Sequence, residues 1–168
     1  MKKYIQLALM AVLVFAATAT ASAQKFGYVN SAEILAELPA MKAAESNLEA
    51  LQKQLQKQGQ AMVESFQKDY AALEEKARGG TMSPKDQQTE AAGLETRQKE
   101  IQAYEQKMVQ DLQEKRATLL EPIYKDVNDA IAAVAKEMGY QFIFDQQVLL
   151  YGEEAADVSA AVKAKLGL

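Results

Sequence analysis

The strongest constraint in this sequence is a helical pattern about a hundred residues long that is interrupted only once. From Ala40 to Arg78 apolar residues recur at steps of three and four, and the same spacing returns from Pro84 to Met138. At 1.5 Å per residue these segments predict helices of about 58 Å and about 80 Å. Because a compact domain of this size is much narrower, the middle of the chain must extend as an arm.

A short turn joins the two helical segments. Residues 79–84 contain two glycines that can take positive φ, then Ser83 as a helix cap and Pro84 as a first-turn residue. The shortness of the turn requires the helices to run antiparallel, as a hairpin. Gly139 is placed to end the return helix in a left-handed conformation. Pro122 lies inside that helix and predicts a kink near residues 118–122.

Strand patterns flank the hairpin. Residues 25–29 and 140–145 are rich in aromatic and β-branched side chains and predict strands. Residues 148–151 predict a further strand, after a tight turn at 145–147. Because proline cannot donate a backbone hydrogen bond, Pro39 is expected to end a short helix that starts at Asn30.

The chain is expected to close with a short helix at 159–166, capped by Asp157 or Ser159. The predicted fold class is α+β, mostly α: a long antiparallel helical hairpin arm on a small β body. The predicted domains are a signal peptide at 1–23 and a single domain at 24–168. Within that domain the body is 24–39 and 139–168, and the arm is 40–138.

The body is too small to be comfortably stable alone. It holds roughly 45 residues, near the limit below which a domain usually needs disulfides, metals or oligomerisation, and the chain has no cysteine. We therefore expect several copies to combine their strands into one core, although the number of copies does not follow from this argument. The predicted oligomer core consists of Phe26, Tyr28, Phe142, Phe144, Val148 and Leu150.

The amino terminus predicts export. Lys2 and Lys3 precede an apolar stretch at 7–17, and Ala21–Ala23 is a small-x-small cleavage pattern before Gln24. A membrane anchor is the alternative, but polar residues weaken the second half of the stretch and no stop-transfer pattern follows. A lipid anchor would need a cysteine. No stable membrane insertion is expected after cleavage, which leaves 17 basic and 23 acidic residues, a net charge of −6.

The composition excludes most catalytic chemistry. The chain has neither histidine nor cysteine, which removes cysteine nucleophiles, Ser-His pairs and His/Cys zinc sites. Adjacent carboxylates at Glu74–Glu75 and Glu153–Glu154 lie in an arm surface and a loop, where no cleft would separate their pKa values. We predict no enzyme activity and no catalytic, metal-binding or cofactor-binding residue. The acidic balance also argues against a nucleic-acid partner.

The arm offers candidate contacts for other polypeptides. Methionine and aromatic side chains suit promiscuous surfaces, although helical spacing alone predicts that the same residues pack the two helices together. Residues 52–60 alternate glutamine with other residues and include Gly59, which favours either a pliable stretch of arm or ordinary solvated surface. The candidate client contacts are Met62, Phe66, Tyr70, Leu73, Ile101, Tyr104 and Met108.

An ordered set of short motifs resembles the Skp/OmpH family of periplasmic holdase chaperones. The set comprises Phe26–Asn30, the glycine-tipped hairpin, Glu121–Tyr124, Val134–Tyr140 and Asp157–Ser159. The resemblance implies a periplasmic, jellyfish-like homotrimer whose arms hold unfolded outer-membrane β-barrel proteins without ATP.

One feature departs from the family's better-known, basic members. The distal arm at 60–105 carries six basic and nine acidic side chains, a net charge of −3. Lipopolysaccharide binding is therefore not carried over. A structural coiled-coil spacer or adaptor of the cell envelope is the alternative function.

Overall fold

The computed structural model describes residues 24–168, so the predicted signal peptide at 1–23 lies outside the described residues. The described chain forms two compact units. One comprises residues 24–31 and 129–167, and the other comprises residues 32–128 with the terminal Leu168. The longest helix contributes to both units. We refer to the first as the body and to the second as the arm.

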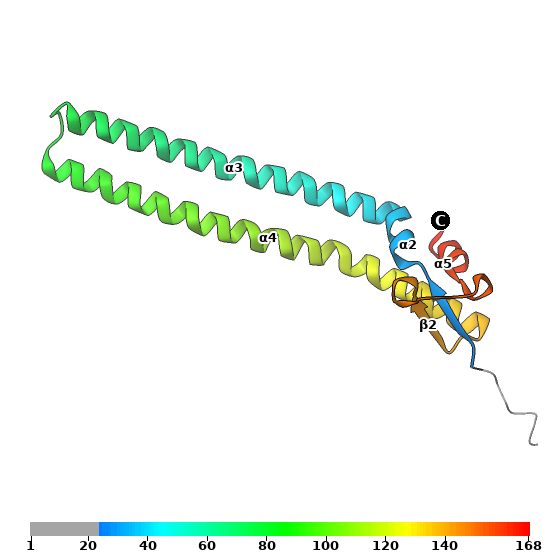
Figure 1. The fold of residues 1–168 in the computed structure, drawn as a ribbon. Coiled ribbons are helices and arrows are strands. Elements are labelled where there is room, and N and C mark those ends of the chain that lie inside the picture. The colour runs from blue at the N-terminus through cyan, green and yellow to red at the C-terminus, as the bar shows by residue number, and fades with distance from the viewer. Residues whose placement is uncertain (1–23) are drawn as a thin grey trace, which may run out of the picture. The chain divides into compact units, whose positions relative to one another are not determined.

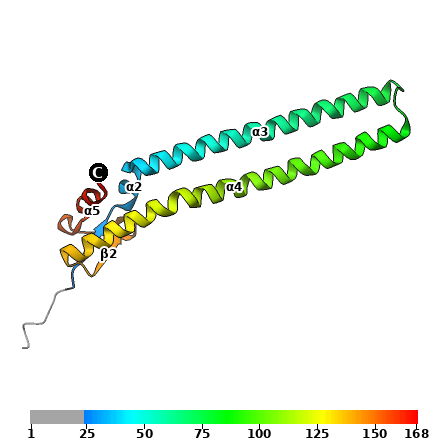
Figure 2. The same cartoon turned by 180° about the vertical axis from the view of Figure 1, so that it is seen from behind.

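The arm is an antiparallel hairpin of two long helices. α2 (Ser31–Glu37) leads into α3 (Pro39–Arg78), which is followed by α4 (Pro84–Met138). Both views show α3 and α4 side by side (Figures 1 and 2). The predicted ends at Arg78, Pro84 and Met138 are confirmed. α4 continues through Pro122 without interruption, and the predicted kink stays a prediction.

The body is built on a parallel strand pair. β1 (Phe26–Val29) pairs with β2 (Phe142–Asp145) in the register Phe26↔Phe142 to Val29↔Asp145. Parallel strands need a long crossover connection, which here consists of α2, α3 and α4. The other side of β1 is bridged at Tyr28 by Asp157, and α5 (Ser159–Leu166) closes the chain where the sequence predicted it.

Small apolar side chains form the centre of the body. The least exposed are Val29, Val134, Val158 and Val162. Close packing also explains Gly27, where an added Cβ would lie 3.0 Å from the Tyr140 ring. Gly139 ends α4 with a φ of +71°, as predicted.

The predicted strand at Val148–Tyr151 is wrong. Val148 ends a 3₁₀ helix, η2 (Gln146–Val148), and the three residues after it have no regular structure. The Asp145 carboxylate accepts a hydrogen bond from the Gln147 backbone N–H at 2.8 Å, which favours the local turn. A strand also needs a neighbouring edge, and the described residues of a single chain bring none to this segment. A second 3₁₀ helix, η3 (Glu154–Ala156), follows within the predicted loop.

Candidate functional site

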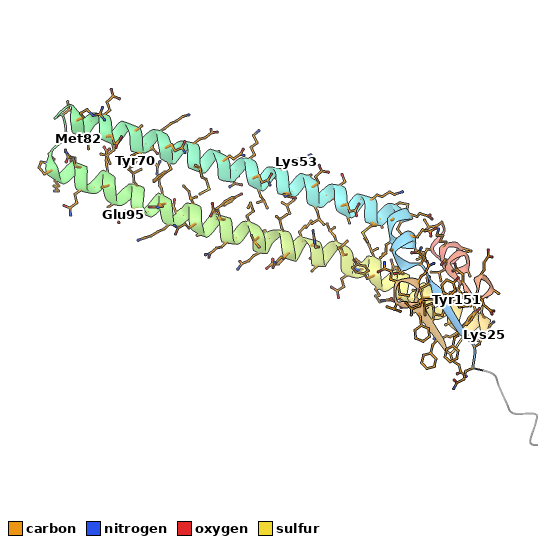
Figure 3. The ribbon with its side chains drawn as sticks, viewed as in Figure 1. Lys25, Lys53, Tyr70, Met82, Glu95 and Tyr151 are labelled. Carbon is orange, nitrogen blue, oxygen red and sulfur yellow. The ribbon has the colours of Figure 1, made fainter. Side chains whose placement is uncertain are left out.

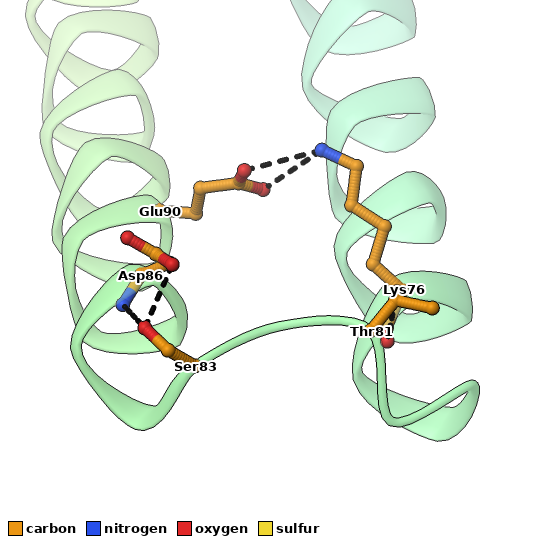
Figure 4. A network of polar contacts seen from close by, with 5 residues as sticks. All are labelled: Lys76, Thr81, Ser83, Asp86 and Glu90. Atoms are coloured by element: carbon orange, nitrogen blue, oxygen red, sulfur yellow. Dashed lines mark hydrogen bonds and ion pairs between the residues drawn. The ribbon is translucent and has the colours of Figure 1, made fainter.

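Three polar contacts tie α3 to α4 along the arm. The Tyr104 hydroxyl donates to the Leu55 carbonyl at 2.9 Å. Nearer the hairpin turn, Asp69 forms an ion pair with Arg97. The last tie joins Lys76 to Glu90, with Nζ 3.1 Å from Oε1, as Figure 4 shows. These contacts are spaced along the hairpin, so its two helices are joined at intervals by polar groups as well as by apolar packing.

The hairpin turn is stabilised by local hydrogen bonds. Ser83 Oγ accepts from the Asp86 backbone N–H at 3.2 Å and donates to Asp86 Oδ2 at 2.7 Å, which caps α4 as predicted (Figure 4). The Thr81 hydroxyl donates to the Lys76 carbonyl at 3.2 Å, and Gly80 takes a φ of +64°. The turn is therefore a structural connection, with Asp86 favourably placed in the first turn of α4.

Most of the candidate client contacts are turned partly into the hairpin. The half-buried members of that set are Met62, Phe66, Leu73, Ile101, Tyr104 and Met108. Tyr70 differs, because half of its surface is exposed, and its position on α3 is labelled in Figure 3. Its ring centroid lies 6.3 Å from that of Phe66. Helix–helix packing therefore accounts for six of the seven residues in part, while Tyr70 offers an exposed aromatic face.

An open groove of about 830 Å³ lies between the two helices. Its apolar lining comes from Val63, Ile101, Tyr104 and Met108, and its polar lining is mostly glutamine, with Glu64 and Glu105. Gly59 contributes to one wall, where a Cβ would lie 3.4 Å from the Tyr104 ring. The hairpin seam is therefore only partly closed, and its apolar atoms remain accessible beside hydrogen-bonding side chains.

The body exposes an aromatic cluster. Phe26, Phe142 and Phe144 stack with centroid separations of 5.8 to 6.3 Å, and they are 47%, 55% and 42% exposed. Val148, Leu150 and Tyr151 are more exposed still, with Leu150 entirely in solvent; Tyr151 is labelled in Figure 3. Contiguous apolar surface of this kind usually marks an interaction site. Five of the six residues of the predicted oligomer core are therefore accessible to another chain.

Tyr28, the sixth residue, is covered by its own chain. Its side chain is 8% exposed, and a Cβ added to Gly152 would lie only 2.7 Å from the ring. Burial raises the pKa of the Tyr28 phenol above its usual value, and the carboxylates of Asp157 and Glu154 add to the rise. The phenol therefore stays protonated at neutral pH, and its role lies within the body core.

Hydrogen bonds link separate segments of the body. The Ser31 hydroxyl donates to Asp145 Oδ2. Ser159 Oγ accepts from the Asn30 backbone N–H at 2.9 Å and donates to Asp157 Oδ1 at 2.5 Å. The Asp145 carboxylate and the Ser159 hydroxyl thus each join a segment from the start of the chain to one from its end. These hydrogen bonds tie the junction of β1 and α2 to β2 and the start of α5.

Two further features of residues 24–168 bear on function. The side chains there form no cluster of three or more carboxylate, histidine or cysteine groups that would suit a metal ion. Within the same residues, no helix combines the length and the apolar character needed to cross a membrane.

Sequence reasoning missed one apolar feature of α4. Ala117, Leu120 and Tyr124 form a stripe on the helix surface, and Tyr124 is 46% exposed. Their spacing of three and four residues was available in the sequence. Leu119, Ile123 and Val127 follow the same spacing, so the periodicity of residues 84–138 did not separate this stripe from the hairpin seam.

Comparisons with known proteins identify one family and one similar fold. The family model described as Outer membrane protein (OmpH-like) matches residues 25–166. A solved structure from Caulobacter crescentus CB15, described as a candidate outer membrane chaperone (OmpH-like), matches with a TM-score of 0.75 at 18% identity. The match covers 86% of this chain and 85% of that one. At this identity it bears on the fold, and it confirms the predicted α+β, mostly α architecture. No curated protein matches the sequence.

Proposed function

Because the chain belongs to the OmpH-like family, we propose that it is a periplasmic holdase chaperone. It binds unfolded outer-membrane β-barrel proteins, prevents their aggregation, and works as a homotrimer without ATP. Capture is passive: the arms offer many weak contacts, and a client leaves when it folds or when a folding partner competes for it.

The observation that carries this proposal is the partly open seam of the hairpin. Two helices cannot enclose their apolar residues on all sides, so groove-lining groups such as Ile101, Tyr104 and Met108 are left half-buried. An unfolded chain lying along the groove can cover these atoms, and the glutamines beside them can hydrogen-bond to its backbone. Methionine and glutamine side chains adapt to different sequences, which suits a surface that must accept many clients.

The charge of the arm favours apolar and hydrogen-bonding capture. The distal arm has a net charge of −3, which gives it no general attraction for acidic polypeptides. We therefore expect client binding to persist at high salt, because surface charge interactions are strongly screened there.

The exposed aromatic cluster of the body supports self-association, while the number of three copies rests on the family resemblance. Three stacked phenylalanines with roughly half of their surface in water are costly for a solitary body of about 45 residues. Covering Phe26, Phe142 and Phe144 with the same residues of further copies would complete the core. Cyclic symmetry is the usual way for identical subunits to do this. Export to the periplasm rests on the predicted signal peptide at 1–23.

The first experiment measures aggregation and mass together. A urea-unfolded outer-membrane β-barrel protein is diluted with and without the mature chain, in the absence of nucleotide, while turbidity is followed. Light scattering gives the mass of the added protein. We expect suppression at one trimer per client by a species of about three times the monomer mass. A trimer that leaves turbidity unchanged would contradict the holdase and favour the envelope spacer.

A pair of variants tests the role of the body. Phe142→Asp places a charge in the aromatic cluster and is expected to give monomers. Val109→Asp is the control, because Val109 is similarly exposed, at 51%, but lies on α4 within the arm. If Phe142→Asp keeps the trimer mass, the aromatic cluster is not the oligomer core.

A further inference from the structure

The stripe on α4 formed by Ala117, Leu120 and Tyr124 lies on the flank of the hairpin seam. Ile123 and Val127 are 7% and 3% exposed, whereas Ala117 is exposed and Leu120 is half-buried. At 100° per residue the stripe is centred about a quarter of a turn from Ile123. In the part of the chain that the structure describes, only residues of α4 line this stripe.

A two-helix hairpin needs one apolar seam on each helix. A second stripe beside the first is typical of a helix that has another helical neighbour. Charged side chains border the stripe, with Arg116 on one side and Glu121 and Lys125 on the other. The order of these charges distinguishes between possible neighbours.

A parallel second copy of α4 fits the charge pattern. Placing Ala117 and Tyr124 at heptad positions a, and Leu120 at d, puts Arg116 at g and Glu121 at the following e. In parallel helices a g side chain faces the e side chain five residues further along the partner. Arg116 of one copy would therefore face Glu121 of another, with opposite charges. In an antiparallel pair the same flank of each helix faces its counterpart, so a pair centred on the stripe would instead bring Glu121 opposite Glu121 of the partner, with like charges.

The remaining polar positions agree with this arrangement. Lys115 and Pro122 fall at position f, the side of the helix furthest from such a partner. Proline lacks a backbone N–H, and at this position the resulting irregularity faces away from the contact. Parallel orientation is also the one that copies related by a rotation axis along the helices would adopt.

We propose that the Ala117–Leu120–Tyr124 stripe packs against the same stripe of a second copy of this chain, in parallel, with Arg116 paired to Glu121 of the neighbour. This inference rests on the homo-oligomer of the proposed function and assigns it a contact beyond the body. It joins the arms over residues 116–124 and leaves the part from 84 to 112 free to receive a client.

Cysteine cross-linking tests the contact directly, because the chain has no cysteine of its own. The mature chain carrying Ala117→Cys is treated with a short bismaleimide cross-linker, and covalent dimers are measured on denaturing gels. Lys115→Cys is the matched control, two residues away at position f. We expect abundant dimers for the cysteine at 117 and background levels for the one at 115. Equal yields at both positions would overturn the proposal.

Charge reversal tests the pairing. In the Ala117→Cys background, Arg116→Glu or Glu121→Arg alone places like charges together, and each is expected to lower the association constant by roughly tenfold. The two reversals combined restore opposite charges and should restore the cross-link. Circular dichroism confirms that each variant keeps its helix. Failure of the double variant to recover, with helix intact, would refute the parallel register.

The outcomes separate this contact from the proposed function. A trimer that suppresses aggregation but gives no dimer at 117 overturns the stripe contact and leaves the holdase standing. Loss of maleimide labelling at 117 only when client is added, without dimers, also overturns it and makes the client the occupant. A monomer without holdase activity removes both the stripe contact and the proposed function.

Discussion

The two glycines inside the arm helices provide a matched pair for measuring how tightly the hairpin packs. Gly59 lies in α3 and Gly93 in α4. A Cβ at Gly93 would meet nothing within 4 Å, whereas one at Gly59 would lie 3.4 Å from Tyr104 Cε1 and 3.7 Å from its Cδ1. The two sites share the same backbone cost of glycine in a helix and differ in the neighbouring ring.

The structure gives the expected size of each effect. Gly93→Ala should raise the free energy of unfolding by about 1 kcal/mol per chain, because alanine is that much more favourable than glycine inside a helix. Gly59→Ala should gain nearly the same amount. Its Cβ reaches the edge of ordinary van der Waals contact, where each added carbon contact contributes about 0.1–0.2 kcal/mol.

A larger side chain should reverse the sign at Gly59 alone. Leucine there would extend past the Cβ into the Tyr104 ring, adding an overpacking cost of about 1–3 kcal/mol. Displacing the ring would also break the hydrogen bond to the Leu55 carbonyl, a further loss of about 1 kcal/mol. Gly93→Leu should be stabilising or neutral, because leucine is a good helix former and the site is open.

The assay is urea unfolding followed by helical circular dichroism, at one fixed protein concentration because an oligomer's stability depends on it. Amide hydrogen exchange across residues 56–60 then reports whether Gly59→Ala slows local opening of the arm. If Gly59→Ala is destabilising by 1 kcal/mol or more while Gly93→Ala is stabilising, the seam is tighter than the structure shows and the reasoning fails.

Three further predictions concern single contacts. Tyr104→Phe removes the donor to the Leu55 carbonyl and should cost about 1 kcal/mol, measured as a shift in urea midpoint; no shift would show that the bond contributes nothing net. Lys25→Met removes a hydrogen bond to the Met138 carbonyl at 3.0 Å and a cation 4.2 Å from the Tyr140 ring centroid. It should lower stability by about 1 kcal/mol, whereas Lys25→Arg should retain most of it in a thermal melt. Gly152→Ala places a Cβ 2.7 Å from the Tyr28 ring and should cost about 1–3 kcal/mol, with changed tyrosine near-ultraviolet dichroism; an unchanged spectrum and midpoint would contradict the close contact.

The helix ends were predictable because local residues determine them. Gly80 and Gly139 take the positive φ expected of them, and the Ser83 side chain caps α4 through Asp86. None of these signals depends on a distant segment. The register of β1 with β2 could not be predicted from local signals, because it requires residues near the two ends of the chain to meet.

The errors occur where structure depends on neighbours. The Val148–Tyr151 pattern suits a strand, but a strand also needs a partner edge, and the local hydrogen bond from Gln147 to Asp145 directs the chain into a 3₁₀ turn instead. The burial of Tyr28 likewise depends on the approach of Gly152. For the candidate site, spacing identified the arm's apolar residues but not which of them face solvent. Spacing alone could not show that Tyr70 is exposed while Met62 is turned partly into the hairpin.

The parallel pairing of β1 with β2 has a consequence for the order of events during synthesis. Phe26 is paired with Phe142, 116 residues later. β1 is therefore synthesised early and has no pairing partner until almost the whole chain has been made. The α3–α4 hairpin can form in the meantime from contacts close in sequence, since only residues 79–83 separate its helices. A chain stopped between residues 129 and 141 would therefore carry a finished arm and an unpaired apolar strand. Unpaired strands of this kind associate readily with one another. Aggregation of a newly made copy is therefore prevented only when the residues from 142 onwards have been added and β2 has paired with β1.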